Sequence, residues 1–344
     1  MIVLGIDTSC DDTAVGIVRD RAVLSNVVVS QAALHARFGG VMPEEASREH
    51  LGLIDEVATR ALAEAGIALA EVDAVAATYG PGLVGSLLVG LGYAKGLAWG
   101  RGLPFVAVHH LEGHVAASLA GGGLEAPYLC LVASGGHTVL FDVATPGDFR
   151  RVGGSRDDAA GEAFDKVARL LGLPYPGGPS VASLAERGTV DGVPLPVPMR
   201  AQRGYDFSFS GLKTAVAVLL ERNPDAMIAD VAATFQARVV GSLVDVTRRA
   251  AADIGRDDVV VAGGVAANRA LRAAFDETGL RLHFPAPGLA TDNGAMIALA
   301  AAARLASGRV TPGGDLGVDA APYQPLGEGP SRPRDATATA TGRS

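Results

Sequence analysis

The sequence predicts an α/β protein with two lobes, in which one strand-and-turn architecture is repeated. The chain has 344 residues, and because single hydrophobic cores stop growing at roughly 250–300 residues, two lobes are expected. Three apolar runs each end in a turn of small residues, and segments with helical periodicity lie between them. This alternation is typical of a duplicated α/β architecture.

Three segments are predicted to be strands followed by tight turns. Residues 2–6 are apolar, lead into the polar turn DTSCDDT and continue as AVGIV. Residues 129–143 repeat this pattern as LCLVA, SGGHT and VLFDV. Residues 259–262 lead into GGVAANRALR, which predicts a strand, a glycine turn and a helix. The similarity of the first two units favours a duplication.

Two long segments, residues 49–65 and 228–254, are predicted to be helices. In the first of them apolar side chains recur with a 3.6-residue period. The proline- and glycine-rich segment 173–198 is expected to be irregular and to lie over a surface or cleft. The tail, residues 325–344, has low complexity and is predicted to be disordered.

The N-terminus and the cysteine content predict where the protein works. The sequence MIVLGIDTSCDD turns acidic where a signal peptide would continue apolar, which argues against secretion. Residues 83–99 contain Lys95 and several glycines and are barely long enough to span a membrane, so a buried helix is the better interpretation. Cys10 and Cys130 form no CxxC pair, which argues against a disulfide framework. We therefore expect a cytoplasmic protein with no membrane partner.

Composition and charge limit the class of protein and its partners. Hydrophobic residues make up 49% of the chain and charged residues 19%, which is too apolar for a disordered protein. The net charge of −8 opposes binding to nucleic acid. A nucleic-acid partner would therefore need a local basic patch or a helper subunit.

The segment HHLEGHVAASLA, residues 109–120, is the strongest chemical signal. If it is helical, His110 and His114 lie one turn apart on the same face, where two imidazoles can bind one metal ion. The alternative is one buried histidine with surface partners, but Asp292 is available as a third ligand and favours the metal site. Glu112 lies about 200° around the helix from His110, so the segment lacks the base of an HExxH metalloprotease.

Two turns are candidates for binding a phosphate or a cation. In SGGHT, the backbone N–H groups of Gly135 and Gly136 can approach a phosphate because no Cβ intervenes, although such turns are also common as purely structural hairpins. In DTSCDDT, Asp7, Asp11 and Asp12 gather carboxylates, which repel one another unless a cation or hydrogen-bond donors lie nearby. An exposed acidic turn is the alternative.

Three further polar residues lie at or near the start of a predicted helix. Asp165 can accept hydrogen bonds from ribose hydroxyls, and the alternative is a helix-start acid favoured by the helix dipole. Asn268 follows the turn formed by Gly263 and Gly264 and can both donate and accept hydrogen bonds. Asp292 is expected to cap the apolar helix that follows it, which is also its structural alternative to a metal ligand.

Together these segments resemble the ASKHA superfamily of actin-like, sugar-kinase and Hsp70-type ATPases, and more closely the bacterial tRNA N6-adenosine threonylcarbamoyltransferases of the Kae/Gcp family. The motifs occur in that family's order, from residue 2 to about residue 322. They are GIDTSCDDT, GGVMPEEASREH, YGPGLVGSLLVG, HHLEGH, SGGHT, GEAFDKVARLLGLPYPGGP, FSFSGLKT, GGVAANRALR and TDNGAMIA. The resemblance implies two duplicated α/β lobes with a cleft between them. One lobe would comprise residues 1–110 and about 293–322, and the other residues 111–292.

The resemblance also implies a reaction. Threonylcarbamoyl-AMP would donate its threonylcarbamoyl group to N6 of the adenosine 3′ to the anticodon, in tRNAs that read codons starting with A, and AMP would leave. One Fe2+ ion, with zinc as the alternative, would be held by His110, His114 and Asp292. Asp11 or Asp12 would take the proton of the attacking amine. The residues that match the family's adenylate site are Val132, Ala133, Ser134, Gly135, Gly136, Asp165, Gly178 and Asn268.

By the same resemblance the chain would work with tRNA, with a degenerate ASKHA paralogue (TsaB-like) and with a small ATPase (TsaE-like). The chain departs from the family pattern at Ala182, where many relatives carry Asp, and at Val132, where archaeal relatives can place a tyrosine ligand. Two other functions are alternatives. The position of Glu112 argues against a metallopeptidase, and a non-catalytic nucleotide-binding scaffold would have no need of a metal triad.

Overall fold

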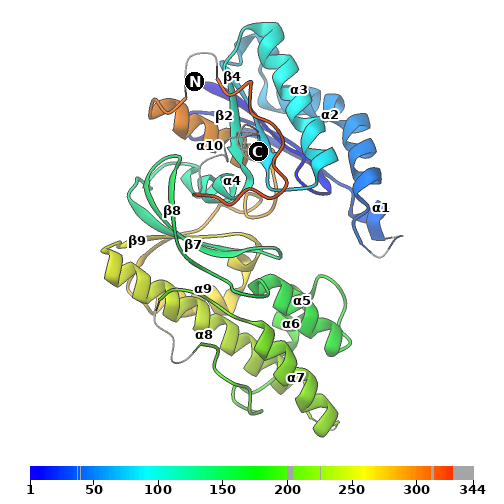
Figure 1. Ribbon diagram of the computed structural model, residues 1–344, viewed down its shortest axis with the longest axis vertical. Coiled ribbons are helices and arrows are strands. Elements are labelled where there is room, and N and C mark those ends of the chain that lie inside the picture. The colour runs from blue at the N-terminus through cyan, green and yellow to red at the C-terminus, as the bar shows by residue number, and fades with distance from the viewer. Residues whose placement is uncertain (37, 39, 200–203, 225, 311–313, 328–344) are drawn as a thin grey trace, which may run out of the picture.

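The computed structural model describes residues 1–36, 38, 40–199, 204–224, 226–310 and 314–327, which form two lobes (Figure 1). The strands in the first lobe are β1 (Ile2–Asp7), β2 (Asp12–Arg19), β3 (Ala22–Ser30), β4 (Ala74–Gly80) and β5 (Phe105–His109). The strands in the second lobe are β6 (Tyr128–Ala133), β7 (Thr138–Thr145), β8 (Asp148–Gly154), β9 (Asp258–Ala262) and β10 (Arg281–His283). The helices are α1 (Ala32–Ala36), α2 (Pro43–Ala65), α3 (Val84–Arg101), α4 (His110–Ala116), α5 (Ala160–Leu170), α6 (Gly177–Ala185), α7 (Ser210–Arg222), α8 (Ile228–Ile254), α9 (Arg269–Asp276) and α10 (Gly294–Ala306).

The two sheets have the same topology, which confirms the predicted duplication. The strand order is β3-β2-β1-β4-β5 in the first sheet and β10-β9-β6-β7-β8 in the second. Read in the opposite direction, the second order places β6 to β10 where β1 to β5 lie in the first. In each sheet the central strand is antiparallel to the next strand in sequence and parallel to its other neighbour. Equivalent turns of the two lobes therefore lie at equivalent ends of their sheets.

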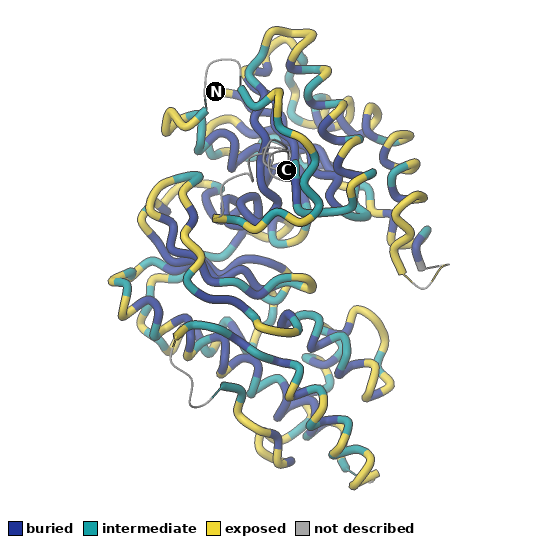
Figure 2. The backbone as a smooth tube through the Cα atoms, viewed as in Figure 1, coloured by how far each residue is buried: buried dark blue, intermediate teal, exposed yellow. Residues whose placement is uncertain are grey.

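Two helices lie between the sheets, and the others cover the outer faces (Figure 1). α2 and α3 pack on the first sheet, and α5 to α9 share a core with the second. α10 packs on β1 and β2, while α4 contacts strands of both sheets and α10. Side chains of β6 alternate between two cores: Leu129 and Leu131 face the outer helices, and Cys130 and Val132 face α4 and α10. Figure 2 shows the strands of both lobes as the most continuously buried segments.

The longest helices follow the predicted periodicity. Residues 49–65 lie in α2 and residues 228–254 form α8, as predicted. Residues 83–99 fall largely within α3, which buries only one face, since Trp99 is exposed. No helix in the described part of the chain is long and apolar enough to cross a membrane.

The expectation for residues 173–198 is wrong in part, because α6 forms within them. Residues 328–344, the larger part of the predicted disordered tail, lie outside the described residues. The division of the chain into lobes at residues 110 and 292 stays a prediction. In the structure α10, which begins after the second of these positions, packs on the first sheet.

Candidate metal centre and cavity

The candidate metal ligands are positioned by α4 and by the turn that precedes α10. His109 ends β5, and its Nδ1 accepts a hydrogen bond from the backbone N–H of Leu111 (3.2 Å), which caps the start of α4. All residues of α4 are buried, because this helix lies between the two sheets. His110 and His114 therefore project from one face of a buried helix, one turn apart.

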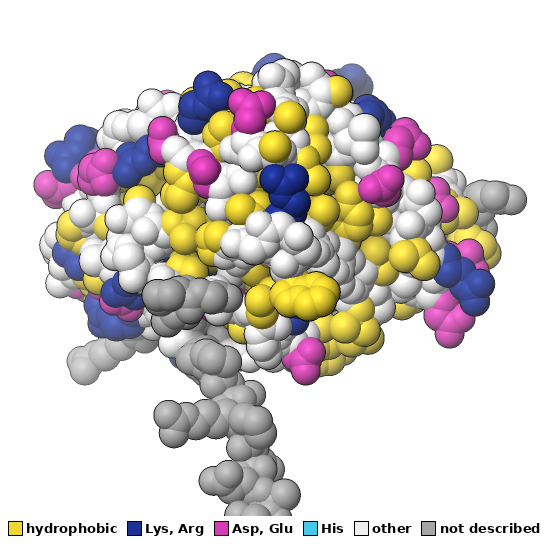
Figure 3. Space-filling view, turned by 90° about the horizontal axis from the view of Figure 1, so that it is seen from above, with side chains coloured by type: hydrophobic (Ala, Val, Ile, Leu, Met, Phe, Trp, Pro, Cys, Tyr) yellow, Lys and Arg dark blue, Asp and Glu magenta, His cyan; other side chains and the backbone are white. Residues whose placement is uncertain are grey.

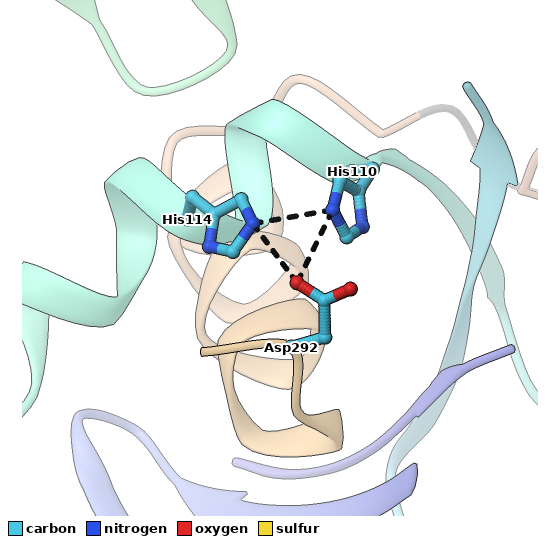
Figure 4. Close-up of side chains that lie close together, drawn as sticks. All are labelled: His110, His114 and Asp292. Atoms are coloured by element: carbon cyan, nitrogen blue, oxygen red, sulfur yellow. Dashed lines mark hydrogen bonds and ion pairs between the residues drawn. The ribbon is translucent and has the colours of Figure 1, made fainter. Parts of the chain in front are cut away.

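His110, His114 and Asp292 meet at one point, as Figure 4 shows. The Nε2 atoms of the two rings are 3.1 Å apart. Oδ1 of Asp292 lies 3.5 Å from Nε2 of His110 and 3.2 Å from Nε2 of His114. One possible ligand atom from each residue thus lies within 4.8 Å of the others. Two buried imidazoles that converge with a carboxylate form a candidate metal site.

The surroundings of this triad fit a bound cation. Nδ1 of His110 lies 3.5 Å from Oδ2 of Asp7 and 3.2 Å from Oγ of Ser9, an arrangement that orients imidazoles toward a metal. Burial opposes charge on His110, but Asp292 and Asp7 outweigh it and raise the pKa of this ring to about 9. Oδ1 of Asp7 is buried and has no hydrogen-bond partner among the described residues. The carboxylates therefore favour positive charge at the triad, which a divalent cation would supply.

Asp292 does not cap α10, contrary to the expectation from the sequence. The cap is Asn293, whose Oδ1 accepts a hydrogen bond from the backbone N–H of Met296 (2.9 Å). Nδ2 of Asn293 donates to the carbonyl oxygens of Leu289 (3.2 Å) and Thr291 (2.8 Å). Because the neighbouring amide takes the cap position, the Asp292 carboxylate is free to face the histidines. Burial opposes its charge, yet His110 and His114 lower its pKa.

The triad forms part of the wall of a cavity of about 450 Å³ that both lobes line. Four turns reach this cavity, and they follow β1, β4, β6 and β9, which are equivalent positions of the duplicated sheets. The lining residues are Ser9, Cys10, Asp12, Pro81, Gly82, Leu83, His110, His114, Ser134, Gly135, Gly136, His137, Gly264, Ala290, Thr291 and Asp292. A metal-ligand set and two glycine-containing turns therefore share one space.

The predicted adenylate-binding residues divide into two groups. Ser134, Gly135 and Gly136 line the cavity. Val132 and Ala133 are fully buried in β6, where their side chains pack in the cores on either side of the sheet. The residues that are absent from the lining of this cavity are Val132, Ala133, Asp165, Gly178 and Asn268.

Asp165 lies in the middle of α5, so its predicted place at the start of a helix is wrong. Its Oδ1 instead accepts a hydrogen bond from the backbone N–H of Gly177 (2.8 Å), the first residue of α6. Gly178 follows in the first turn of α6, and a Cβ there would meet open space. Asn268 caps α9, and its Nδ2 donates to Oε1 of Gln236 (2.9 Å).

The acidic residues near the site have different positions. Asp12 lines the cavity, whereas Asp11 does not. Burial raises the pKa of Asp12, against the opposite effect of a hydrogen bond with Ser30. Glu112 is buried, lies 3.9 Å from a guanidinium nitrogen of Arg304, and is absent from the cavity lining. As the helical spacing predicts, Glu112 is not placed to act as the base of a metalloprotease.

The sequence analysis missed the loop 80–83 and His137 as cavity residues. A Cβ at Gly82 would lie 2.4 Å from the carbonyl oxygen of Ser9, so only glycine allows this approach. The loop follows β4 as the glycine turn at 263–264 follows β9, and a comparison of the two lobes strand by strand would have identified it. Burial lowers the pKa of His137 to about 4, so its ring is neutral near pH 7.

Two sheets of identical topology that direct their turns into a shared cavity define an actin-like ATPase fold of the ASKHA type. Solved structures show the same fold. HypF from T. kodakarensis has a TM-score of 0.61 and 15% identity, covering 89% of this chain and 48% of that one. Component A of (R)-2-hydroxyglutaryl-CoA dehydratase from Acidaminococcus fermentans has a TM-score of 0.54 and 19% identity, covering 88% and 96%. At these identities the likeness concerns the fold alone.

The chain belongs to the TsaD family, described as tRNA N6-adenosine threonylcarbamoyltransferase, whose model matches residues 22–299. The tRNA N6-adenosine threonylcarbamoyltransferase of Thermus thermophilus is 56% identical over 329 residues, which cover 95% of this chain and 100% of the relative. By name, the family consists of transferases whose substrate is tRNA.

Proposed function

We propose that this protein transfers the threonylcarbamoyl group from threonylcarbamoyl-AMP to N6 of the adenosine 3′ to the anticodon, in tRNAs that read codons starting with A, with release of AMP. Membership in the TsaD family supports this activity. The observation that carries the proposal is that two histidines, a carboxylate and four backbone turns face one cavity. Such a site can hold a cation and an anionic nucleotide together.

The turn 134–136 is proposed to bind the phosphate of the adenylate through its backbone N–H groups. A Cβ at Gly135 or Gly136 would meet no atom within 4 Å, so this backbone is open to a ligand. The start of α5 supports the turn, since the N–H of Gly161 donates to the carbonyl oxygen of Ser134 (3.1 Å). The remaining contacts of the adenylate site are assigned to Val132, Ala133, Asp165, Gly178 and Asn268.

One iron(II) ion per subunit is proposed to be held by His110, His114 and Asp292. Two histidines and one carboxylate with open positions are the ligands of non-haem iron(II) sites, and zinc accepts the same donor atoms. When bound, the ion would supply a Lewis acid beside an oxygen of the donor. Elemental analysis of the purified protein distinguishes the two metals, and iron at about one ion per chain is the expected result.

The chain's own residues are proposed to orient the reactants and move one proton. Attack by a weakly nucleophilic exocyclic amine requires close positioning and stabilisation of the developing negative charge. The N–H donors of the turn 134–136 are available for the second task. Asp12 or Asp11 would accept the amine proton. Asp12 is favoured because it lines the cavity and because burial raises its pKa, which suits a general base.

The change Asp12→Asn is expected to slow single-turnover transfer by about 10²–10⁴-fold, the usual contribution of a general base. Asp11→Asn serves as the matched control, because Asp11 is adjacent in sequence but does not line the cavity. Single-turnover rates are measured with preloaded threonylcarbamoyl-AMP and excess enzyme. Unchanged rates in both variants would remove these carboxylates from the mechanism.

The function itself is tested by incubation of the protein and its partners with threonine, bicarbonate, ATP, a threonylcarbamoyl-AMP synthase and unmodified tRNA. Digestion of the tRNA and mass spectrometry should reveal threonylcarbamoyladenosine at the position 3′ to the anticodon. Casein is the parallel substrate for the metallopeptidase alternative, and we expect no cleavage. Casein cleavage without tRNA modification would reverse the assignment.

The partners are proposed to be tRNA, a degenerate ASKHA paralogue (TsaB-like) and a small ATPase (TsaE-like). The net charge of −8 makes the chain alone a poor ligand for RNA. On the face of the first lobe shown in Figure 3, basic side chains lie scattered among acidic and apolar ones. Because the substrates are tRNA and an adenylate made from ATP, we place the protein in the cytoplasm.

The isolated chain is therefore expected to bind tRNA weakly, with a Kd above about 10⁻⁶ M at physiological salt. Fluorescence anisotropy with labelled tRNA, with and without the two partner proteins, measures this difference. Binding in the nanomolar range by the chain alone at moderate salt would contradict the idea that partners build the basic surface.

A further inference from the structure

Behind the cavity, a chain of hydrogen bonds connects the start of α2 to the turn that follows β1. Its side chains belong to His35, Gln31 and His50, which are all 4% exposed or less. The N–H of Met42 donates to Nδ1 of His35 (3.3 Å), whose Nε2 lies 3.1 Å from Oε1 of Gln31. Nε2 of Gln31 lies 3.2 Å from Nδ1 of His50, and Nε2 of His50 lies 3.1 Å from the carbonyl oxygen of Cys10.

The two ends of this chain determine the direction of every hydrogen bond in it. The N–H of Met42 can only donate, so Nδ1 of His35 accepts and its Nε2 carries the proton. The carbonyl of Cys10 can only accept, so Nε2 of His50 carries the proton and its Nδ1 accepts. The amide of Gln31 then accepts from one ring and donates to the other. Both rings must be neutral, and burial lowers the pKa of His50, which keeps it so.

The turn at the end of this chain forms part of the cavity wall. Ser9, Cys10 and Asp12 all line the cavity. Besides the bond from His50 to the Cys10 carbonyl, the backbone N–H of Gln31 donates to the carbonyl oxygen of Asp11 (2.9 Å). Two successive carbonyls of the turn are thus held from the side that faces away from the ligand. A buried carbonyl that loses its donor loses a bond that water cannot readily replace.

We propose that His50 is a positioning residue for the transfer reaction, because it holds the turn 9–12 in its place at the wall of the donor cavity. This inference rests on the function proposed above. Neither ring nitrogen of His50 is free for a ligand, since Oγ1 of Thr13 lies 2.7 Å from Nδ1 and the Cys10 carbonyl occupies Nε2. The residue therefore acts through the turn, on which Asp12 lies.

The test compares three variants of the full chain, assayed with its partners: His50→Leu, His50→Gln and Ile54→Ala. Leucine removes both ring nitrogens, whereas glutamine can place an N–H where Nε2 donates. Ile54 is buried one turn further along α2, so its truncation lowers stability without removing a bond to the turn.

Two measurements are made on each variant. The first is the rate at which iodoacetamide alkylates Cys10. Cys130 is fully buried, so the reaction reports on one site. Burial raises the pKa of Cys10 to about 12, which makes the reaction slow in the intact turn and easily detected once the turn opens. The second measurement is the single-turnover transfer rate together with the KM for tRNA.

For His50→Leu we expect Cys10 to be alkylated about tenfold faster and transfer to be about ten- to a hundredfold slower, at an unchanged KM for tRNA. His50→Gln should recover most of both losses. Ile54→Ala should keep the alkylation rate of the original protein at a lower Tm. Unchanged alkylation in His50→Leu, or equal defects in the Leu and Gln variants, would overturn the proposal. If the original protein makes no threonylcarbamoyladenosine, the proposed function fails, and the alkylation rates still decide whether His50 holds the turn.

Discussion

The change His114→Ala is expected to weaken metal binding by at least about a hundredfold, because loss of even an indirect partner of a metal ligand costs 10–100-fold in affinity. His114 is 4% exposed, and its Nε2 lies within about 3.2 Å of both other members of the triad. Alanine would remove one of three converging donor atoms from a buried site, where no neighbouring side chain is placed to substitute. Transfer activity should fall at least as far as metal occupancy.

The matched control for this prediction is Glu112→Gln on the same helix. Glu112 is buried like His114 but faces Arg304, so the change should leave metal content unaltered. Metal content is measured by elemental mass spectrometry after dialysis, and activity by formation of threonylcarbamoyladenosine. Full metal retention by the His114→Ala variant, or metal loss in Glu112→Gln alone, would show that the triad is not the binding site.

The change Gly16→Ala is expected to destabilise the fold by about 3 kcal/mol or more, the upper range for forcing extra atoms into a packed interior. A Cβ at Gly16 would lie 2.1 Å from the backbone nitrogen of Ala295, and one at Gly294 would lie 2.2 Å from the backbone nitrogen of Gly16. The opposing atoms are backbone, so α10 as a whole would have to move. Because Asp292 precedes α10, this movement would also displace a metal ligand.

Gly92→Ala provides the control for the glycine change. Gly92 is exposed within α3, and a Cβ there would meet no atom within 4 Å. Alanine in the interior of a helix should therefore stabilise the protein by up to about 1 kcal/mol. Urea unfolding curves of both variants give the comparison. A Gly16→Ala protein with the original midpoint and full metal content would refute the tight packing of α10 on β1 and β2.

Helices with strong periodicity were predictable, and the exception has a local cause. α2 and α8 bury regular apolar stripes, which the sequence displays directly. α6 begins with Gly177, Gly178 and Pro179, residues that indicate a loop when they are read alone. Its first N–H is held by Asp165 from α5. A contact from another helix thus helps to form an element that local propensity disfavours.

The roles of the acids depended on neighbours that pattern alone could not rank. Asp292 and Asn293 are both good cap residues, and the backbone of the turn selects the second. Asp165 was expected at a helix start, but α5 begins five residues earlier. In both cases the residue type was informative and its partner was not, because hydrogen-bond geometry is decided by the fold around it.

The sequence by itself determined the duplicated strands and turns, the long helices, and the two histidines one helical turn apart. These features follow from side-chain periodicity and backbone preferences that act over a few residues. Only the tertiary structure decided that Ser9 touches His110, 101 residues away, and that four turns meet in one cavity. Such contacts depend on how two sheets pack across α4 and α10, and packing of distant surfaces leaves no periodic trace in the chain.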